Sequence, residues 1–458
     1  MEHVYGMLVS EQMSNCGDIL EKAAPSERPR PSPGKRSILM LMGVLALASC
    51  FDQVLLPDVA TDGRLTVTND EEALAERLSY VEEDIPIDPP SSASPALFSG
   101  AAAPPTGAPP TASSVRLTLV AELTPPNVDG QVVQATSISP PRRFTFAVSY
   151  NTSGSPFVGA VDYVINPFGL TPRLISSVVF SDSDVSAVGL DDDWFYAAQA
   201  TGASTFATPA AIERLAVGSS GILLENNDRF DLTSFAATSV LAVGAVVYVT
   251  TGDNGHLYAL DASDMTTLGQ YPLTDARWVA HDADNGRIVV VQGTPGRISV
   301  FQEGVFPGGS MNLLDEFPFT GANVPQSKST VEVLGGKAFI AGGPDGVLVM
   351  CLDNGLIVGS VPRPDPAALG LAPSVVVTNA VTVDEDLMFI SNGEAGVYVA
   401  AGDAEFASTP CAAPLNITML GHLRFDDLQS VNHVDYENKR LLIAAGLGGL
   451  KIVRINVN

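Results

Sequence analysis

The side chains best suited to metal or acid–base chemistry in this sequence are two histidines near aspartates. His281 directly precedes Asp282, and His433 lies two residues before Asp435. Imidazole nitrogens and carboxylate oxygens together suit several transition metals. When the surrounding sequence repeats are aligned, however, the two histidines fall one position apart, and the other repeats offer no third ligand of this type. We therefore expect loop or packing roles for these histidines and no metal site.

Three short acidic clusters raise the question of calcium. A calcium loop needs six or more oxygen ligands at set spacings and ends in a bidentate acid, and none of the clusters completes that pattern. The third cluster contains Asp-Asn-Gly, which favours a turn between two strands. We expect no cofactor, with calcium as the open alternative. The clusters are Asp182 with Asp184, Asp191 to Asp193, and Asp282 with Asp284.

The sequence holds no motif of a familiar enzyme class. It has no Gly-x-Ser-x-Gly elbow, His-Glu-x-x-His helix, phosphate loop or Cys-x-x-Cys pair. Cys351 and Cys411 are the cysteines of the C-terminal body. Cysteines of an exported protein can form a disulfide. One repeat separates the two cysteines, because Cys411 is placed at the entry to the last repeat. The sequence is therefore compatible with a disulfide and with two separate thiols.

The elements that must position these side chains follow from a repeat in the C-terminal half. Five times an apolar strand, a Gly-x-x-Gly turn and a second apolar strand follow one another, with the first glycines 41, 50, 50 and 53 residues apart. This period is typical of repeat folds. We expect the glycines to be structural, at turns with positive φ inside a hairpin. The pairs are Gly252 and Gly255, Gly293 and Gly296, Gly343 and Gly346, Gly393 and Gly396, and Gly446 and Gly449.

The repeat predicts an all-β protein, specifically a β-propeller. Each unit of about 45 residues has room for four short strands, which is one propeller blade. Two less regular units, 144–167 and 193–218, precede the five clear ones. We therefore predict seven blades over residues 115–458, with six or eight as alternatives. Ring closure should make strand 450–455 an outer strand of the last blade and place strand 115–120 in the blade beside it, joined by face-to-face contact or by strand exchange.

An export signal precedes this body. Lys35 and Arg36 are followed by the apolar run 37–49, which is too short to span a bilayer as a helix. The residues Leu47-Ala48-Ser49-Cys50 resemble the lipobox of bacterial lipoproteins. The resemblance implies removal of residues 1–49 and lipidation of Cys50, which is strong enough to anchor the chain. The alternative is an ordinary cleaved signal. The long stretch before Lys35 fits a start codon assigned too far upstream.

A tether is expected between the signal and the propeller, over residues 50–114. Its first part is acidic, and residues 94–114 are uncharged and mostly Ala, Pro, Ser, Gly and Thr. Such a composition buries too little apolar surface to offset the entropy of ordering, so we expect an extended, disordered spacer. A short helix around residues 71–81 is compatible with this segment.

The charge of the chain excludes several partner classes. The formal net charge is −27, and removal of residues 1–49 leaves it unchanged. A strongly acidic protein repels nucleic acids, phosphate-rich ligands and anionic lipid surfaces. We therefore expect no nucleic-acid partner.

The repeats resemble a known family. Residues 338–353, AFIAGGPDGVLVMCLD, and 441–456, LLIAAGLGGLKIVRIN, look like LVIVD repeats, the β-propeller repeats of exported bacterial surface proteins. The resemblance covers residues 240–456, implies a propeller, and carries no assigned activity. The first two units match the pattern poorly.

Together these observations predict a surface lipoprotein, anchored in the cell envelope of a Gram-negative bacterium and most simply in its outer membrane. Its propeller would bind a protein or glycan partner without catalysis. The alternative is a propeller hydrolase or lyase that acts on polysaccharide or a small molecule at the axial pocket. Three or more titratable side chains converging on one ring opening would favour the enzyme, and a channel lined by small apolar residues would favour binding.

Overall fold

The computed structural model describes most of the chain from residue 59 to residue 457. The predicted signal and Cys50 lie outside the described residues. Also outside them are residues 62, 90–113, 129, 143, 153, 170, 203–207, 219–220, 322–323, 325–326 and 424–428.

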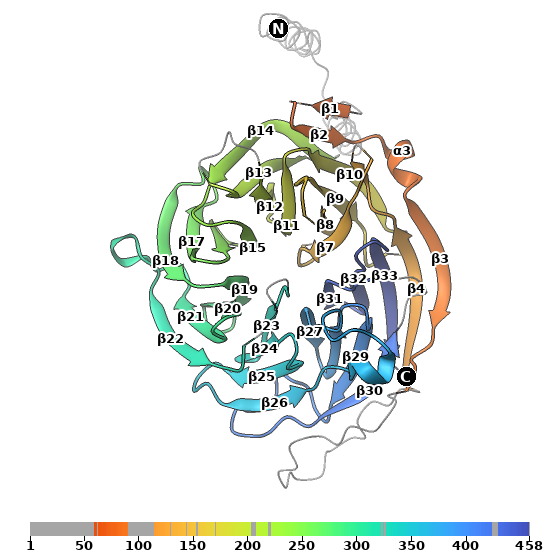
Figure 1. Cartoon of the computed structure of the whole chain (residues 1–458), viewed down its shortest axis with the longest axis vertical. Helices are drawn as coiled ribbons and strands as arrows, with labels where there is room; N and C mark the ends of the chain where they lie inside the picture. Colours follow the sequence, from red (N-terminus) through yellow and green to blue (C-terminus); the bar gives the residue numbers. More distant parts are fainter. Residues whose placement is uncertain are drawn as a thin grey trace, which may run out of the picture. The chain divides into compact units, whose positions relative to one another are not determined.

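The described residues form a seven-bladed β-propeller, as the repeat predicted (Figure 1). Each blade is an antiparallel sheet in which the chain starts at an innermost strand and proceeds outward. Blades 1 to 3 are β7 (Gln134–Ile138), β8 (Thr145–Asn151), β9 (Gly159–Ile165), β10 (Arg173–Phe180); β11 (Ser183–Leu190), β12 (Trp194–Thr201), β13 (Ala210–Gly218), β14 (Gly221–Asp231); and β15 (Ala237–Val243), β16 (Val246–Thr251), β17 (Gly255–Asp261), β18 (Thr267–Leu273).

Blades 4 to 6 continue the same order around the ring. They are β19 (Ala276–Asp282), β20 (Arg287–Gln292), β21 (Arg297–Gln302), β22 (Leu313–Pro318); β23 (Val331–Leu334), β24 (Lys337–Ala341), β25 (Val347–Cys351), β26 (Ile357–Val361); and β27 (Ala380–Asp384), β28 (Leu387–Ser391), β29 (Val397–Gly402), β30 (Ile417–Leu423). Three short elements lie outside the blades: the hairpin β5 (Asn127–Val128) and β6 (Gln131–Val132), η1 (Pro307–Gly309), and α4 (Pro366–Leu369).

Blade 7 closes the ring with strands from both ends of the described chain. Its order from the axis outward is β31 (His433–Glu437), β32 (Arg440–Ala444), β33 (Leu450–Val457), β4 (Val115–Leu123) and β3 (Leu78–Ile85). β4 pairs antiparallel with β33 over its whole length. Strands 115–120 and 450–455 meet as predicted, but β4 belongs to blade 7 itself and not to the blade beside it. The prediction of β33 as an outer strand is wrong, because β4 and β3 cover it and make it the third strand.

The repeat motif corresponds to the second and third strands of a blade. All five Gly-x-x-Gly turns join these two strands within one blade, for example β32 and β33. The large apolar residue four positions before the first glycine is buried in every case, as Tyr248 and Phe389 are, because it packs between neighbouring sheets. Period-two apolar strands therefore fill the space between the blades.

The motif glycines have positive φ in three of the five turns. In blades 5, 6 and 7 both glycines of the turn adopt the left-handed region that other residues avoid, with φ between 55° and 84°. These six residues are Gly343 and Gly346, Gly393 and Gly396, and Gly446 and Gly449.

The expectation of positive φ is wrong for the turns of blades 3 and 4. Neither Gly252 and Gly255 nor Gly293 and Gly296 has positive φ. Three of these four are required by space instead, because a Cβ would overlap a neighbouring atom. The Cβ would lie 1.8 Å from the carbonyl oxygen of Thr251 at Gly255, 2.0 Å from Cζ of Arg277 at Gly293, and 2.3 Å from Cα of Gly321 at Gly296.

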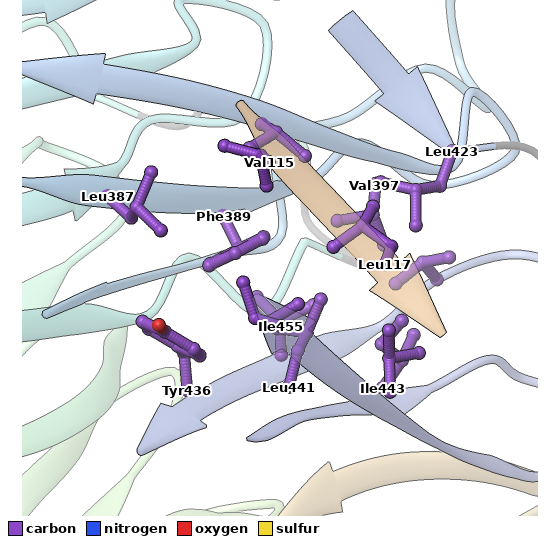
Figure 2. Packing of buried hydrophobic residues seen from close by; sticks show 14 of the residues in the cluster. Val115, Leu117, Leu387, Phe389, Val397, Leu423, Tyr436, Leu441, Ile443 and Ile455 are labelled. Atoms are coloured by element: carbon purple, nitrogen blue, oxygen red, sulfur yellow. The ribbon is translucent and has the colours of Figure 1, made fainter. Parts of the chain in front are cut away.

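The closure is held by apolar side chains. Figure 2 shows Val115 and Leu117 of β4 beside Ile455 of β33, facing Phe389 and Val397 of blade 6. All five side chains are buried in one cluster. We call this junction of blades 6 and 7, together with the segment described next, the seam.

The expectation of a disordered tether is wrong for the described residues 59–88, which we call the N-terminal strap. β1 (Val59–Thr61) and β2 (Leu65–Thr68) extend blade 1 beyond β10, α3 (Glu71–Ala75) follows, and β3 then extends blade 7. Asp88 makes a last backbone pairing with His422 of blade 6. The strap is ordered because its strands form backbone hydrogen bonds with the open edges of the sheets in blades 1 and 7.

Particular side chains of the strap explain why its acidic composition was misleading. Leu65 and Val67 are buried between blades 1 and 2, and Leu74 is buried against blades 1 and 7. Several of its charges meet partners on the ring, so they are not left to solvent. Arg77 binds the buried Asp162 through two hydrogen bonds of 2.9 and 2.5 Å.

Candidate functional site

A pocket of about 650 Å³ opens on the entry face, which we define as the face where the innermost strand of each blade begins. Blades 1 to 5 and blade 7 all contribute to it. All but one of the lining residues are polar. They are Gln134, Thr136, Asn151, Ser186, Thr238, Gly252, Asp253, Asp275, Arg277, Thr294, Ser327, Lys328 and Asn432. We call this the axial pocket.

Part of this polarity is structural. The hydroxyl of Thr238 donates to the carbonyl of Ala276 at 2.8 Å, and the amide of Asn432 donates to the carbonyl of Ala135 at 2.8 Å. Each bond joins the innermost strands of two neighbouring blades. Innermost strands have one edge with no strand partner, so these side chains satisfy backbone groups that would otherwise stay unpaired.

Arg277 is also fully engaged. Its guanidinium binds Asp275 through hydrogen bonds of 3.0 and 2.8 Å, and it donates further to the carbonyls of Val324 and Ser327. The side chain is 6% exposed. Because the bidentate carboxylate neutralises its charge, Arg277 acts as a fixed part of the pocket wall.

Lys328 is different, because the structure places no carboxylate of the described residues within ion-pair distance of it. Its Nζ donates to the carbonyl of Ser186, across the axis in blade 2, at 2.5 Å. It also lies 5.5 Å from the centre of the Trp278 ring, within cation–π range. Burial lowers the pKa of Lys328 to about 7.

Below the pocket lies an axial cluster of Trp278, Lys328 and His433. The rings of Trp278 in blade 4 and His433 in blade 7 lie 4.9 Å apart, so the cluster fills the axis from opposite sides of the ring. Burial, and then the charge of Lys328, lowers the pKa of His433 to about 3, which keeps its imidazole neutral. Its Nδ1 has no hydrogen-bond partner among the described residues.

Two carboxyl groups lie on innermost strands beyond this cluster. Burial, and then the charge of Glu437, raises the pKa of Asp435 to about 7. Burial, and then the charge of Asp435, raises the pKa of Glu332 well above its usual value. Oδ2 of Asp435 lacks a hydrogen-bond partner within the described part of the chain. The axis therefore contains several polar groups that burial destabilises in their charged forms.

A second pocket of about 390 Å³ shares three lining residues with the axial pocket: Gln134, Ser327 and Asn432. It extends from them over blades 5 to 7, past Val375, Glu394 and other residues. Because they share these residues, the two pockets lie side by side, and we call them together the groove.

The candidate ligands considered in the sequence are not brought together. His281 binds Glu303 at 2.8 Å, whereas His433 packs in the axial cluster. Asp282 forms an ion pair with Arg287, and Asp182 forms one with Arg229. These acids hold turns and strands in place, and the Asp-Asn-Gly turn joins β19 and β20 as predicted.

The two body cysteines form a disulfide, with Cα atoms 5.6 Å apart. Cys411 lies between β29 and β30 of blade 6, not at the entry to the last repeat, so the bridge joins the neighbouring blades 5 and 6. Cys351, Asp353 and Cys411 are the one group of metal-type ligand atoms that cluster among the described residues. Their two sulfurs are bonded to each other and are therefore not available as thiolate ligands.

Sequence reasoning missed Lys328, Arg277 and Trp278, although a signal was present. Pocket residues of blades 3, 4, 5 and 7 stand 14 to 16 residues before the first glycine of their own motif. They are Thr238, Arg277, Lys328 and Asn432. An alignment on the turns therefore marks the start of each innermost strand, where side chains of a propeller converge.

Comparisons with known proteins concern the fold. No family model matches the chain, and neither does any curated protein. Solved structures similar to it include the WD40 β-propeller domain of Doa1 (10% identity, 72% of this chain and 95% of that chain, TM-score 0.47). Another is a catalytically inactive variant of virginiamycin B lyase from Staphylococcus aureus with quinupristin (12%, 75% and 100%, 0.49). These likenesses extend to the fold alone.

Within the described residues, no helix is long and apolar enough to cross a membrane.

Proposed function

We propose that this chain is an exported, lipid-anchored binding protein of the bacterial cell envelope, and that it holds a protein or glycan partner on the entry face of its propeller. The export signal ending at Cys50 and the resemblance of residues 240–456 to LVIVD repeats support the anchor and the outer-membrane location. The strongly negative charge supports a partner that is not a nucleic acid.

The axial pocket is the observation that carries the binding role. It is concave, it lies where loops of six blades converge, and most of its lining residues carry hydroxyl, amide or charged side chains. The small apolar lining that we expected of a binding channel is absent from its described residues. Four titratable side chains converge there instead, but Arg277 and Asp275 neutralise each other. The remaining Asp253 and Lys328 do not make a nucleophile with its base, so binding is favoured over hydrolysis.

A matched pair of charge reversals tests the face that binds. Asp253 is an exposed turn residue at the axial pocket, and Asp284 is an exposed turn residue on the opposite face. We expect Asp253→Arg to change recovery of the partner when the full chain is cross-linked and purified from its own envelope, with a rise for an anionic partner and a loss for a neutral or cationic one. Asp284→Arg should leave recovery unchanged. Equal recovery with both variants would rule out the entry face as the binding surface.

The anchor is tested separately. Cys50→Ser should move the protein from the membrane fraction to the soluble fraction, or leave an unprocessed precursor. Membrane retention with normal processing would contradict lipidation at Cys50.

A further inference from the structure

We propose that the axial pocket binds an acidic sugar residue of a glycan chain, with the Lys328 ammonium as the partner of the sugar carboxylate. This inference rests on the proposed binding function and names the ligand class of the same site. Three features of the pocket carry it: its cation without a counter-charge, its hydroxyl- and amide-rich lining, and the groove that it forms with the second pocket.

The first feature is the state of Lys328 compared with the neighbouring Arg277. Both line the pocket, but Arg277 has a bidentate carboxylate and Lys328 has one carbonyl acceptor among the described residues. An ammonium group has three donors, and burial without a counter-charge disfavours it. In a chain with 51 acidic and 24 basic residues, a lysine held away from carboxylates is ready to receive an anionic ligand.

The second feature is the rest of the lining. Ser186, Asn151 and Gln134 of blades 1 and 2 place hydroxyl and amide groups in the lining, and the carbonyl of Ser186 is the one that accepts from Lys328. Hydroxyl and amide groups both donate and accept hydrogen bonds, which matches the alternating hydroxyls of a sugar ring.

The third feature is the groove. The axial pocket shares Gln134, Ser327 and Asn432 with the second pocket over blades 5 to 7. A single sugar fills only part of the axial pocket, and the remaining length fits further residues of a chain. Glu394 lines the second pocket. A second acidic sugar would meet this carboxylate, so the groove favours a chain in which acidic residues are separated by neutral ones.

The experiment compares sugar acids with their neutral counterparts on the full-length chain in detergent. The probes are glucuronate, galacturonate and mannuronate, and their neutral counterparts are glucose, galactose and mannose, in that order. Acetate serves as an anion without hydroxyl groups. Binding is followed by saturation-transfer NMR at pH 6, where Lys328 is protonated. We expect at least one sugar acid to bind, its neutral counterpart to bind more weakly, and acetate to give no signal.

The variants are Lys328→Met and Lys439→Met. Lys439 is exposed in the turn between β31 and β32, so its substitution removes the same charge from the opposite face. Lys328→Met should weaken binding of the sugar acid by about tenfold or more, because a hydrogen bond to a charged group stabilises more than a neutral one. Lys439→Met should have no effect.

Several results would overturn the inference: no sugar acid binds, the neutral sugars bind as well, acetate binds as well, or the two lysine variants behave alike. The comparison of sugar acids with neutral sugars and acetate uses the wild-type chain. It therefore tests the inference even if the Lys328→Met protein does not fold. If no sugar acid binds but Asp253→Arg still changes recovery of the envelope partner and Asp284→Arg does not, the acidic-sugar inference fails while the proposed binding function stands.

Discussion

The seam and the axis of this propeller are built on opposite principles. At the seam, apolar side chains of β4, β33 and blade 6 pack in one buried cluster, and Arg77 finds a buried carboxylate. At the axis, Nδ1 of His433 and Oδ2 of Asp435 have no partner among the described residues, and Lys328 has no counter-charge there. Polar burial without partners destabilises a fold, whereas the seam interactions stabilise it.

This difference separates stability from binding. Residues that a fold retains although they destabilise it are candidates for function. We therefore expect substitutions at the seam to lower stability without changing ligand affinity. Substitutions at the axis should lower ligand affinity without lowering stability.

The largest effect on stability is expected at the strap. Asp162→Ala leaves the Arg77 guanidinium, which is largely buried, without its carboxylate, and removing one partner of such a pair costs about 3–5 kcal/mol. Urea denaturation would measure the change. Arg116→Ala is the control, because it breaks a strap ion pair whose side chains are both more than half exposed and should leave the midpoint nearly unchanged. Similar midpoints for both variants would show that the strap does not support the seam.

The disulfide between blades 5 and 6 should behave like the seam. Reduction of the wild-type chain should lower its free energy of unfolding by about 2–4 kcal/mol, because a cross-link restricts the unfolded chain. Cys411→Ser should show the same loss and no further response to reductant. A titratable thiol at Cys351 or Cys411 in the non-reduced wild type would contradict the bridge.

A turn of the seam should be less tolerant than the equivalent turn at the pocket. Gly449 has φ of 69°, and a Cβ there would lie 2.0 Å from the carbonyl oxygen of Leu123 in β4. Gly449→Val should destabilise the protein by about 1–3 kcal/mol. Gly252 has no positive φ, and the nearest atom to a Cβ there is 3.4 Å away, so Gly252→Ala should change the midpoint little. Thermal unfolding of the two variants gives the comparison, and a larger loss at Gly252 would refute it.

The axis should respond to pH. The pKa of Asp435 is raised to about 7, so the folded state favours its protonated form. The stability that this group contributes is present at pH 4 and is lost as the pH rises through 7. Asp435→Asn should therefore be more stable than the wild type at pH 8, with a smaller difference at pH 4. Urea midpoints at the two pH values measure this, and a variant less stable at pH 8 would show that the carboxylate is satisfied by an unrecognised partner.

The sequence predicted the parts of the fold that depend on a local pattern. The glycine pairs and the apolar positions before them identified a hairpin in five blades, because turn chemistry and strand alternation act over a few residues. The strap was missed because Leu65, Val67 and Leu74 are sparse among charges, and their burial depends on blade edges formed by residues far along the chain.

The turns themselves show where a local pattern stops being informative. The spacing of Gly293 and Gly296 is the same as that of Gly343 and Gly346, yet the first pair lacks positive φ and the second has it. Gly293 is required by the Arg277 guanidinium and Gly296 by the backbone of Gly321, and both neighbours come from outside the turn. The motif therefore predicts that glycine is required. It does not predict whether positive φ or the lack of space for a Cβ is the reason.

The candidate site was predicted much less well, for a physical reason. Lys328, Trp278 and His433 come from blades 5, 4 and 7, and only ring closure brings them together. A single lysine gives no local sign that its ammonium will lie near an axis without a carboxylate. The histidines attracted attention as possible ligands, but the structure uses His433 for ring packing and His281 for a pair with Glu303.

The most direct test of the account is the free energy of unfolding of Lys328→Met at pH 6, measured without ligand. The pKa of Lys328 is lowered to about 7, so protonation disfavours the folded state increasingly as the pH falls below the ordinary lysine value, and fully so below 7. Methionine removes this charge and nearly keeps the length of the side chain. We predict that Lys328→Met is more stable than the wild type at pH 6. A less stable variant would show that Lys328 serves as a structural bridge to Ser186, and would contradict the claim that the axis holds it for a ligand.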